Sequence, residues 1–148
     1  MTATNHAITG AVIATVIHNP AVALPLAFFS HFFQDALPHF GYGGNGGYRQ
    51  AVKHPSLKFV MAGDVVFFMP FVIILLSHHA SLWVYLAAFL ALCPDFYNFI
   101  RYFFLGKGNE DKISQFLTFI QWCERPWGII VEIAWYVAGL ILLVNILP

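Results

Sequence analysis

The chain has 148 residues, of which 59% are hydrophobic and only 9% charged, and its formal net charge is zero. Soluble domains carry roughly 25% charged residues, so this composition excludes an ordinary soluble domain and indicates an integral membrane protein. A neutral chain with a sequence pI of about 7.0 gives no electrostatic reason to expect nucleic acid, so the expected partners are lipid and protein.

Five apolar runs in this sequence approach the roughly 20 residues that a helix needs to cross a bilayer. The sequence therefore predicts one all-α domain with about five transmembrane helices. The first two runs are short and joined by Asn19 and Pro20, so we expect a tight hairpin that crosses a locally thinned bilayer or is partly re-entrant. The predicted spans lie near residues 3–18, 20–37, 57–77, 81–102 and 126–147.

Two connecting segments have compositions of their own. Residues 40–55 are rich in glycine, which predicts a loop that could fold over a site. In residues 111–123, apolar side chains recur at helical spacing opposite Ser114, Gln115 and Gln121. This pattern predicts a short amphipathic helix that lies in the membrane interface.

The basic residues predict the orientation of the chain. Under the five-span topology all of them fall on the side that holds the N-terminus, and the positive-inside rule makes that side cytoplasmic. We therefore expect a multi-pass protein of the inner cell membrane with a cytoplasmic N-terminus. The basic residues are Arg49, Lys53, Lys58, Arg101, Lys107, Lys112 and Arg125.

The second predicted helix ends in a run of ionisable side chains. His31 and Asp35 are four residues apart and share a helical face, and Pro38 stops the helix where His39 can fold back beside them. Ionisable groups at membrane depth are costly and usually mark function. The spacing is typical of metal ligands.

Other predicted helices place His6, Asp64 and Asp95 at a similar depth. An unpaired carboxylate at a helix centre costs about 2.5–3.5 kcal/mol, and no Lys or Arg lies at the same depth. A divalent cation would offset this cost, and imidazole with carboxylate suits zinc, with manganese or iron as alternatives. The predicted ligands are His31, Asp35, His39 and either His6 or Asp64.

A catalytic metal keeps one position open for water and lowers its pKa, so the predicted chemistry is hydrolysis by metal-bound hydroxide. Asp95 or Asp64 would serve as general base, or as a second ligand in a dinuclear centre. Asn98, one turn after Asp95, would orient the substrate or a ligand. Lys58 and Arg101 would attract a phosphate or carboxylate head group.

The motifs His6-x-x-x-Gly10 and His31-x-x-x-Asp35-x-x-Pro38-His39 resemble those of small bacterial and archaeal membrane-bound proteins described as metal-dependent hydrolases. The resemblance covers mainly residues 1–40. It implies a metal held by His and Asp at one membrane face and hydrolysis of a membrane-associated substrate, lipidic or phosphorylated. The chain lacks the His-Arg-x-x-Thr-His-Ser type element of that family.

Two other classes of function stay open. Intramembrane carboxylates and histidines also form the proton relays and ion pathways of transporters. In a structural or partner-binding subunit, the same side chains would only fix helix packing, while residues 40–55 and 111–123 dock another protein. A homo-oligomer is compatible with every one of these interpretations.

Overall fold

The computed structural model describes residues 1–41, 57–105 and 111–148. These residues are mostly helical, which confirms the all-α prediction apart from one pair of two-residue strands. The predicted glycine-rich loop lies outside the described residues except at 40 and 41. The elements are α1 (Ala3–Val16), α2 (Pro20–Ala36), β1 (His39–Phe40), α4 (Leu57–Ser77), α5 (Leu82–Phe103), α6 (Lys112–Ile120), β2 (Glu124–Arg125), the 3-10 turn η1 (Pro126–Gly128) and α7 (Ile129–Ile146).

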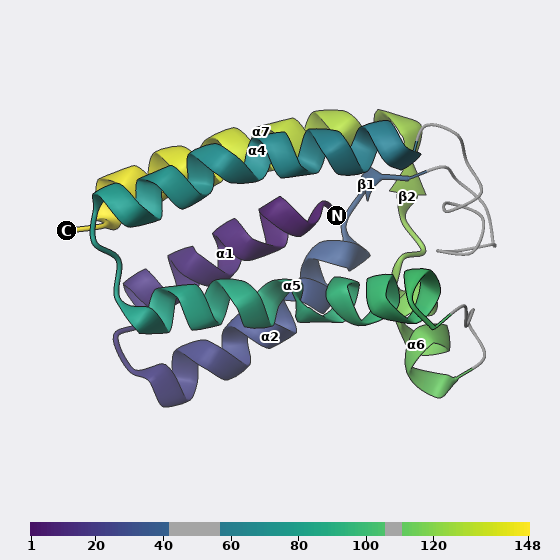
Figure 1. The fold of residues 1–148 in the computed structure, drawn as a ribbon, viewed down its shortest axis with the longest axis horizontal. Coiled ribbons are helices and arrows are strands. Elements are labelled where there is room, and N and C mark those ends of the chain that lie inside the picture. The colour runs from purple at the N-terminus through teal and green to yellow at the C-terminus, as the bar shows by residue number, and fades with distance from the viewer. Residues whose placement is uncertain (42–56, 106–110) are drawn as a thin grey trace.

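Helix α1 runs through the middle of the bundle, with α4 and α7 on one side and α2 and α5 on the other (Figure 1). Its side chains Ala7, Ile8 and Ala11 are fully buried. The outer helices α4 and α7 instead expose large apolar side chains, among them Phe59 and Ile130. Exposed apolar side chains also lie on α2, α5 and α6, so the helices around α1 carry most of the apolar surface, and the first half of α1 is shielded by its neighbours.

Among the described residues, three helices are long and apolar enough to cross a membrane, namely Leu57–Ser77, Leu82–Arg101 and Pro126–Ile146. They are consistent with a membrane protein. Helices α1 and α2 have 14 and 17 residues, or about 21 and 26 Å at 1.5 Å per residue. Because the hydrocarbon core is about 30 Å thick, the two short helices fall below its span, and the predicted count of five is not confirmed.

Local signals account for several helix ends. Asn19 caps α2 by accepting a bond of 3.0 Å from the N–H of Ala21, and Pro20 occupies the first helical position. Asp111 caps α6 in the same way through the N–H of Ser114, at 2.9 Å. The bounds of α4 and the first residues of α1 and α2 lie where predicted, and the other helix ends differ from prediction by one to three residues.

Helices α1 and α5 approach each other closely because the residues between them are small. A Cβ atom on Gly10 would lie only 2.4 Å from the carbonyl oxygen of Ala87 and 2.8 Å from the Cβ of Ala91. His6 lies one turn before Gly10, and Asp95 lies one turn after Ala91. The glycine contact therefore brings the imidazole and the carboxylate toward each other.

The strands join the end of α2 to the start of α7. They are parallel, with His39 opposite Glu124 and Phe40 opposite Arg125. Gly128 packs directly against this pair, because a Cβ there would lie 2.1 Å from the carbonyl carbon of His39. Strands of two residues are too short to show a hydrophobic period, so the sequence did not predict them.

Candidate metal centre

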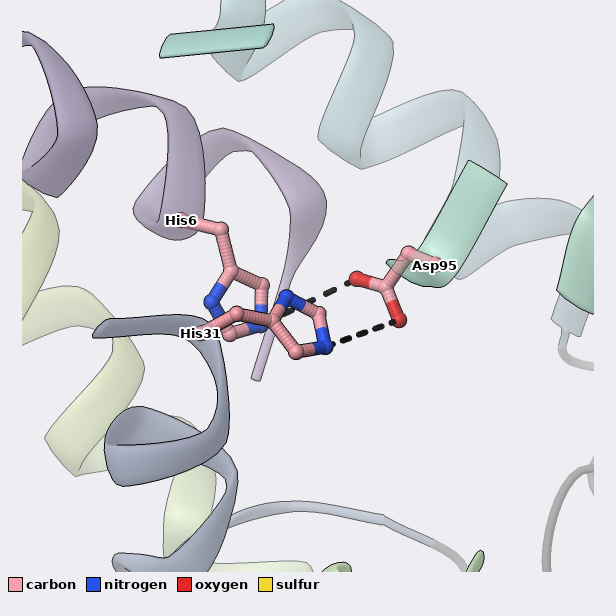
Figure 2. A group of neighbouring side chains, drawn as sticks. All are labelled: His6, His31 and Asp95. Atoms are coloured by element: carbon pink, nitrogen blue, oxygen red, sulfur yellow. Dashed lines mark ion pairs between the residues drawn. The ribbon is translucent and has the colours of Figure 1, made fainter. Parts of the chain in front are cut away.

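His6, His31 and Asp95 meet from three different helices, α1, α2 and α5, and Figure 2 shows both imidazoles directed toward the carboxylate. The two rings stack with centroids 3.9 Å apart. Each residue offers a ligand atom within 4.8 Å of the other two, so the group could hold a metal ion. The imidazole side chains are 0% and 1% exposed and the Asp95 side chain is 26% exposed.

The distances in this group suit a cation better than direct hydrogen bonds. Nε2 of His6 lies 3.7 Å from Oδ2 of Asp95, and Nε2 of His31 lies 4.0 Å from Oδ1. Hydrogen bonds between nitrogen and oxygen span about 2.7–3.2 Å. Tetrahedral zinc with bonds near 2.0–2.1 Å separates its ligands by about 3.4 Å, so a small inward movement would complete the geometry.

The backbone of α5 orients the His31 ring. Nδ1 of His31 lies 2.8 Å from the carbonyl oxygen of Ala91, and since a carbonyl only accepts, Nδ1 carries the proton. In the neutral ring Nε2 then has a lone pair facing Asp95, the arrangement found in metal-ligating histidines. His6 is less constrained, because its buried Nδ1 has no hydrogen-bond partner among the described residues.

Asp35 contacts both imidazoles but is not a member of the three-residue group. Its Oδ1 lies 3.1 Å from Nε2 of His6 and 2.5 Å from the amino group of Met1. Its Oδ2 lies 3.2 Å from Nε2 of His31 and 3.2 Å from Nε2 of Gln121. The predicted ligand Asp35 is thus a neighbour of the histidines with four nitrogen contacts of its own.

Two other carboxylates, the half-buried Asp64 and the buried Glu132, bind the start of α1 instead of the cluster. Asp64 accepts a bond of 3.3 Å from the N–H of Thr4. Glu132 accepts bonds of 3.2 and 3.0 Å from the N–H of Thr2 and one of 2.8 Å from Nδ2 of Asn5. The first N–H groups of a helix lack intrahelical partners and carry its positive dipole. Asp64, predicted as ligand or base, therefore caps α1.

His39 lies in β1, also outside the three-residue group. Its Nδ1 is 2.8 Å from the carbonyl oxygen of Leu37. Burial, followed by the nearby Met1 ammonium, lowers the pKa of His39. The ring is accordingly neutral near pH 7, but the structure does not bring it together with His6, His31 and Asp95.

The remaining predicted residues lie near α6 or at the surface. Asn98 is buried and lies 3.5 Å from the Oγ of Ser114, while Arg101 forms an ion pair of 2.6 Å with Asp111. These contacts join α5 to α6. Lys58 is exposed in the first turn of α4.

Sequence reasoning missed the contacts of Gln121 and of the Ala91 carbonyl. Gln121 did stand out as part of the polar face of residues 111–123, and its position opposite the apolar face was the available signal. The sequence contains no comparable signal for the contact of the Ala91 carbonyl with His31, because every residue has a backbone carbonyl.

No protein-family model, no curated protein and no solved structure matches this chain. The resemblance to membrane-bound hydrolases stays a prediction, and the function proposed below depends on the geometry of the chain itself.

Proposed function

We propose that His6, His31 and Asp95 bind a divalent cation, zinc in the first place with manganese or iron as alternatives, and that the chain hydrolyses a membrane-associated substrate. One observation carries the proposal. Asp95 faces the two imidazole nitrogens at 3.7 and 4.0 Å, beyond hydrogen-bond distance, and its carboxylate accepts no hydrogen bond within residues 1–41, 57–105 and 111–148.

The other carboxylates around the start of α1 make the contrast clear. Asp35 has contacts as short as 2.5 Å, Asp64 accepts from a backbone N–H, and Glu132 accepts from backbone and side-chain donors. Asp95 is partly removed from water and has none of these donors, and removing a carboxylate from water without donors is costly. A cation between Asp95 and the imidazoles would offset that cost.

A bound divalent metal would act as a Lewis acid and lower the pKa of water. His31, oriented by Ala91, and His6 would hold it from the protein interior. Asp95 is the most exposed of the three side chains, so water and substrate would approach from its side. Asp35, beside both imidazoles, would accept the proton released during hydrolysis, in the role first assigned to Asp64 or Asp95.

A membrane location of the substrate is supported by α6. Its residues Ile113, Phe116 and Phe119 are exposed and apolar, and Lys112 is exposed beside them. Such a helix favours the boundary between head groups and acyl chains. We therefore propose a lipidic or phosphorylated substrate at the cytoplasmic leaflet of the inner membrane, with exposed Lys58 attracting its head group.

Metal content tests the proposal. The purified protein in detergent should contain about one zinc per chain by mass spectrometry, and His31→Ala and Asp95→Asn should lose it. His18→Ala is the matched control, because His18 is an exposed histidine beyond the far end of α1. Equal metal in all four proteins, or none after incubation with zinc or manganese, would refute the site. If zinc is present and these two variants lose it, phosphoesters, lipids and amides are the substrates to screen, with Asp95→Asn as the inactive reference.

A purely structural role is the second candidate, and the contacts of Asp35 favour it. Its two oxygens already have four nitrogen neighbours, as expected for a polar network that fixes helix packing. In that case His31→Ala would lower thermal stability while the unmodified protein contains no metal.

A further inference from the structure

Gln121, which follows the last residue of α6, reaches the carboxylate beside the cluster. Its Nε2 lies 3.2 Å from Oδ2 of Asp35. Because a carboxylate only accepts hydrogen bonds, the amide nitrogen of Gln121 is the donor. A residue 86 positions away in the sequence thus contacts the group that touches both imidazoles.

Contacts along α6 hold Gln121 in this place. At the start of the helix, Asp111 forms its ion pair with Arg101. In the middle, the ring of Phe116 packs on Phe32 of α2 at a centroid distance of 5.9 Å. The helix is therefore attached to both α5 and α2, and its end is directed at Asp35.

Metal binding would make this contact more important. Each Nε2 atom has room for one proton or one metal bond, so an imidazole that ligates through Nε2 no longer donates to a carboxylate. Once His6 and His31 ligate through Nε2, neither of these two nitrogens donates a hydrogen bond to Asp35. The donors left to it within the described part of the chain are the amino group of Met1 and the amide of Gln121.

We propose that Gln121 is a positioning residue for the metal centre. It holds Asp35 in place beside the Nε2 atoms of the two ligating imidazoles, so that the carboxylate stays close to the cation and balances its charge. This inference rests on the proposed metal site and adds α6 to it as a supporting element.

Cobalt binding by the full chain in detergent tests the role of Gln121. Gln121→Met keeps the length of the side chain and removes the donor. Loss of a side chain that supports a metal centre from outside its ligands typically costs about 10- to 100-fold in affinity, so we expect that weakening together with a changed visible spectrum of bound Co²⁺. Gln115→Met is the matched control, because Gln115 is exposed on the same helix, and it should bind as the unmodified protein does.

A double-mutant cycle distinguishes action through Asp35 from a general effect on α6. In an Asp35→Asn background, Gln121→Met should change the Co²⁺ affinity by less than about twofold, because the two effects are coupled. Gln121→Leu serves as a second variant if Gln121→Met does not elute as a folded protein.

Three results would overturn the inference. The first is unchanged affinity and spectrum in Gln121→Met, and the second is a full additional loss in the Asp35→Asn background. Both leave the proposed metal site standing. The third, no Co²⁺ binding by the unmodified protein, would refute the metal site itself and the role of Gln121 with it.

Discussion

Replacing Gly10 by alanine tests whether the contact between α1 and α5 sets the geometry of the metal centre. The added Cβ would lie 2.4 Å from the carbonyl oxygen of Ala87 and 2.8 Å from the Cβ of Ala91. The first of these atoms is backbone, so the clash is relieved only if the two helices move apart. His6 and Asp95, each one turn from this contact, would then separate as well.

The expected loss of stability follows from two opposing terms. Overpacking costs about 1–3 kcal/mol, and the backbone contact places Gly10→Ala near the upper end. Alanine recovers about 1 kcal/mol relative to glycine in a helix. The net loss is about 2 kcal/mol, which lowers the melting temperature by about 4–8 °C in a chain of this size.

Thermal unfolding in detergent, followed by circular dichroism, measures this effect. Gly63→Ala is the matched control, because a Cβ on Gly63 of α4 would meet nothing within 4 Å. Its melting temperature should stay the same or rise. Gly10→Ala should also bind Co²⁺ more weakly than Gly63→Ala does. A Gly10→Ala protein that melts at or above the unmodified protein would refute the close approach of α1 and α5.

Two further predictions separate stabilising carboxylates from the metal centre. Asp64→Ala removes the acceptor for the N–H of Thr4, so it should cost about 1 kcal/mol as other lost helix caps do and leave the metal content unchanged, whereas loss of the metal would place Asp64 back in the site. Hydrogen bonds from the backbone N–H of Ser114 lower the pKa of Asp111, so its stabilisation of α6 is present above its unfolded pKa of about 3.9 and lost as the pH falls through the lower folded value. Hydrogen-exchange protection of α6 should follow that curve, and a pH-independent protection would contradict it.

The sequence predicts well what depends on local chemistry. Asn19 with Pro20 marks the start of α2, and Pro38 marks its end. The spacing of His31 and Asp35 places them on one face, and they are in contact in the structure. Each of these features depends on neighbours within about one helical turn, which a single sequence shows directly.

Direction around a helix axis is harder to predict than depth along it. Asp64 and Asp95 fall at similar depths, and the sequence therefore treats them as equivalent. In the structure Asp64 binds the backbone of α1, while Asp95 faces the imidazoles. The difference depends on which face of α4 and of α5 packs against α1, and the long apolar runs of both helices leave that choice to tertiary packing.

The burial of α1 also depends on tertiary packing and is equally hard to predict from the sequence. Its hydropathy resembles that of a short membrane span, so the sequence places it among the spanning helices. Ala7, Gly10 and Ala11 instead allow neighbouring helices to pack closely around it. Small residues favour close helix contacts in membranes, yet they do not reveal how many neighbours a helix has.

The start of α1 explains why polar groups from four helices gather in an otherwise apolar chain. Its unpaired N–H groups would be costly in an apolar environment, and Asp64 and Glu132 satisfy two of them. The need to cap α1 is therefore enough to explain the positions of these two carboxylates. Asp95 contributes to no such cap, and its nearest recorded partners are two histidines beyond hydrogen-bond distance. Helix packing thus explains why Asp64 and Glu132 lie at the start of α1. It does not explain Asp95, and Asp95 is the carboxylate at which a cation would bind.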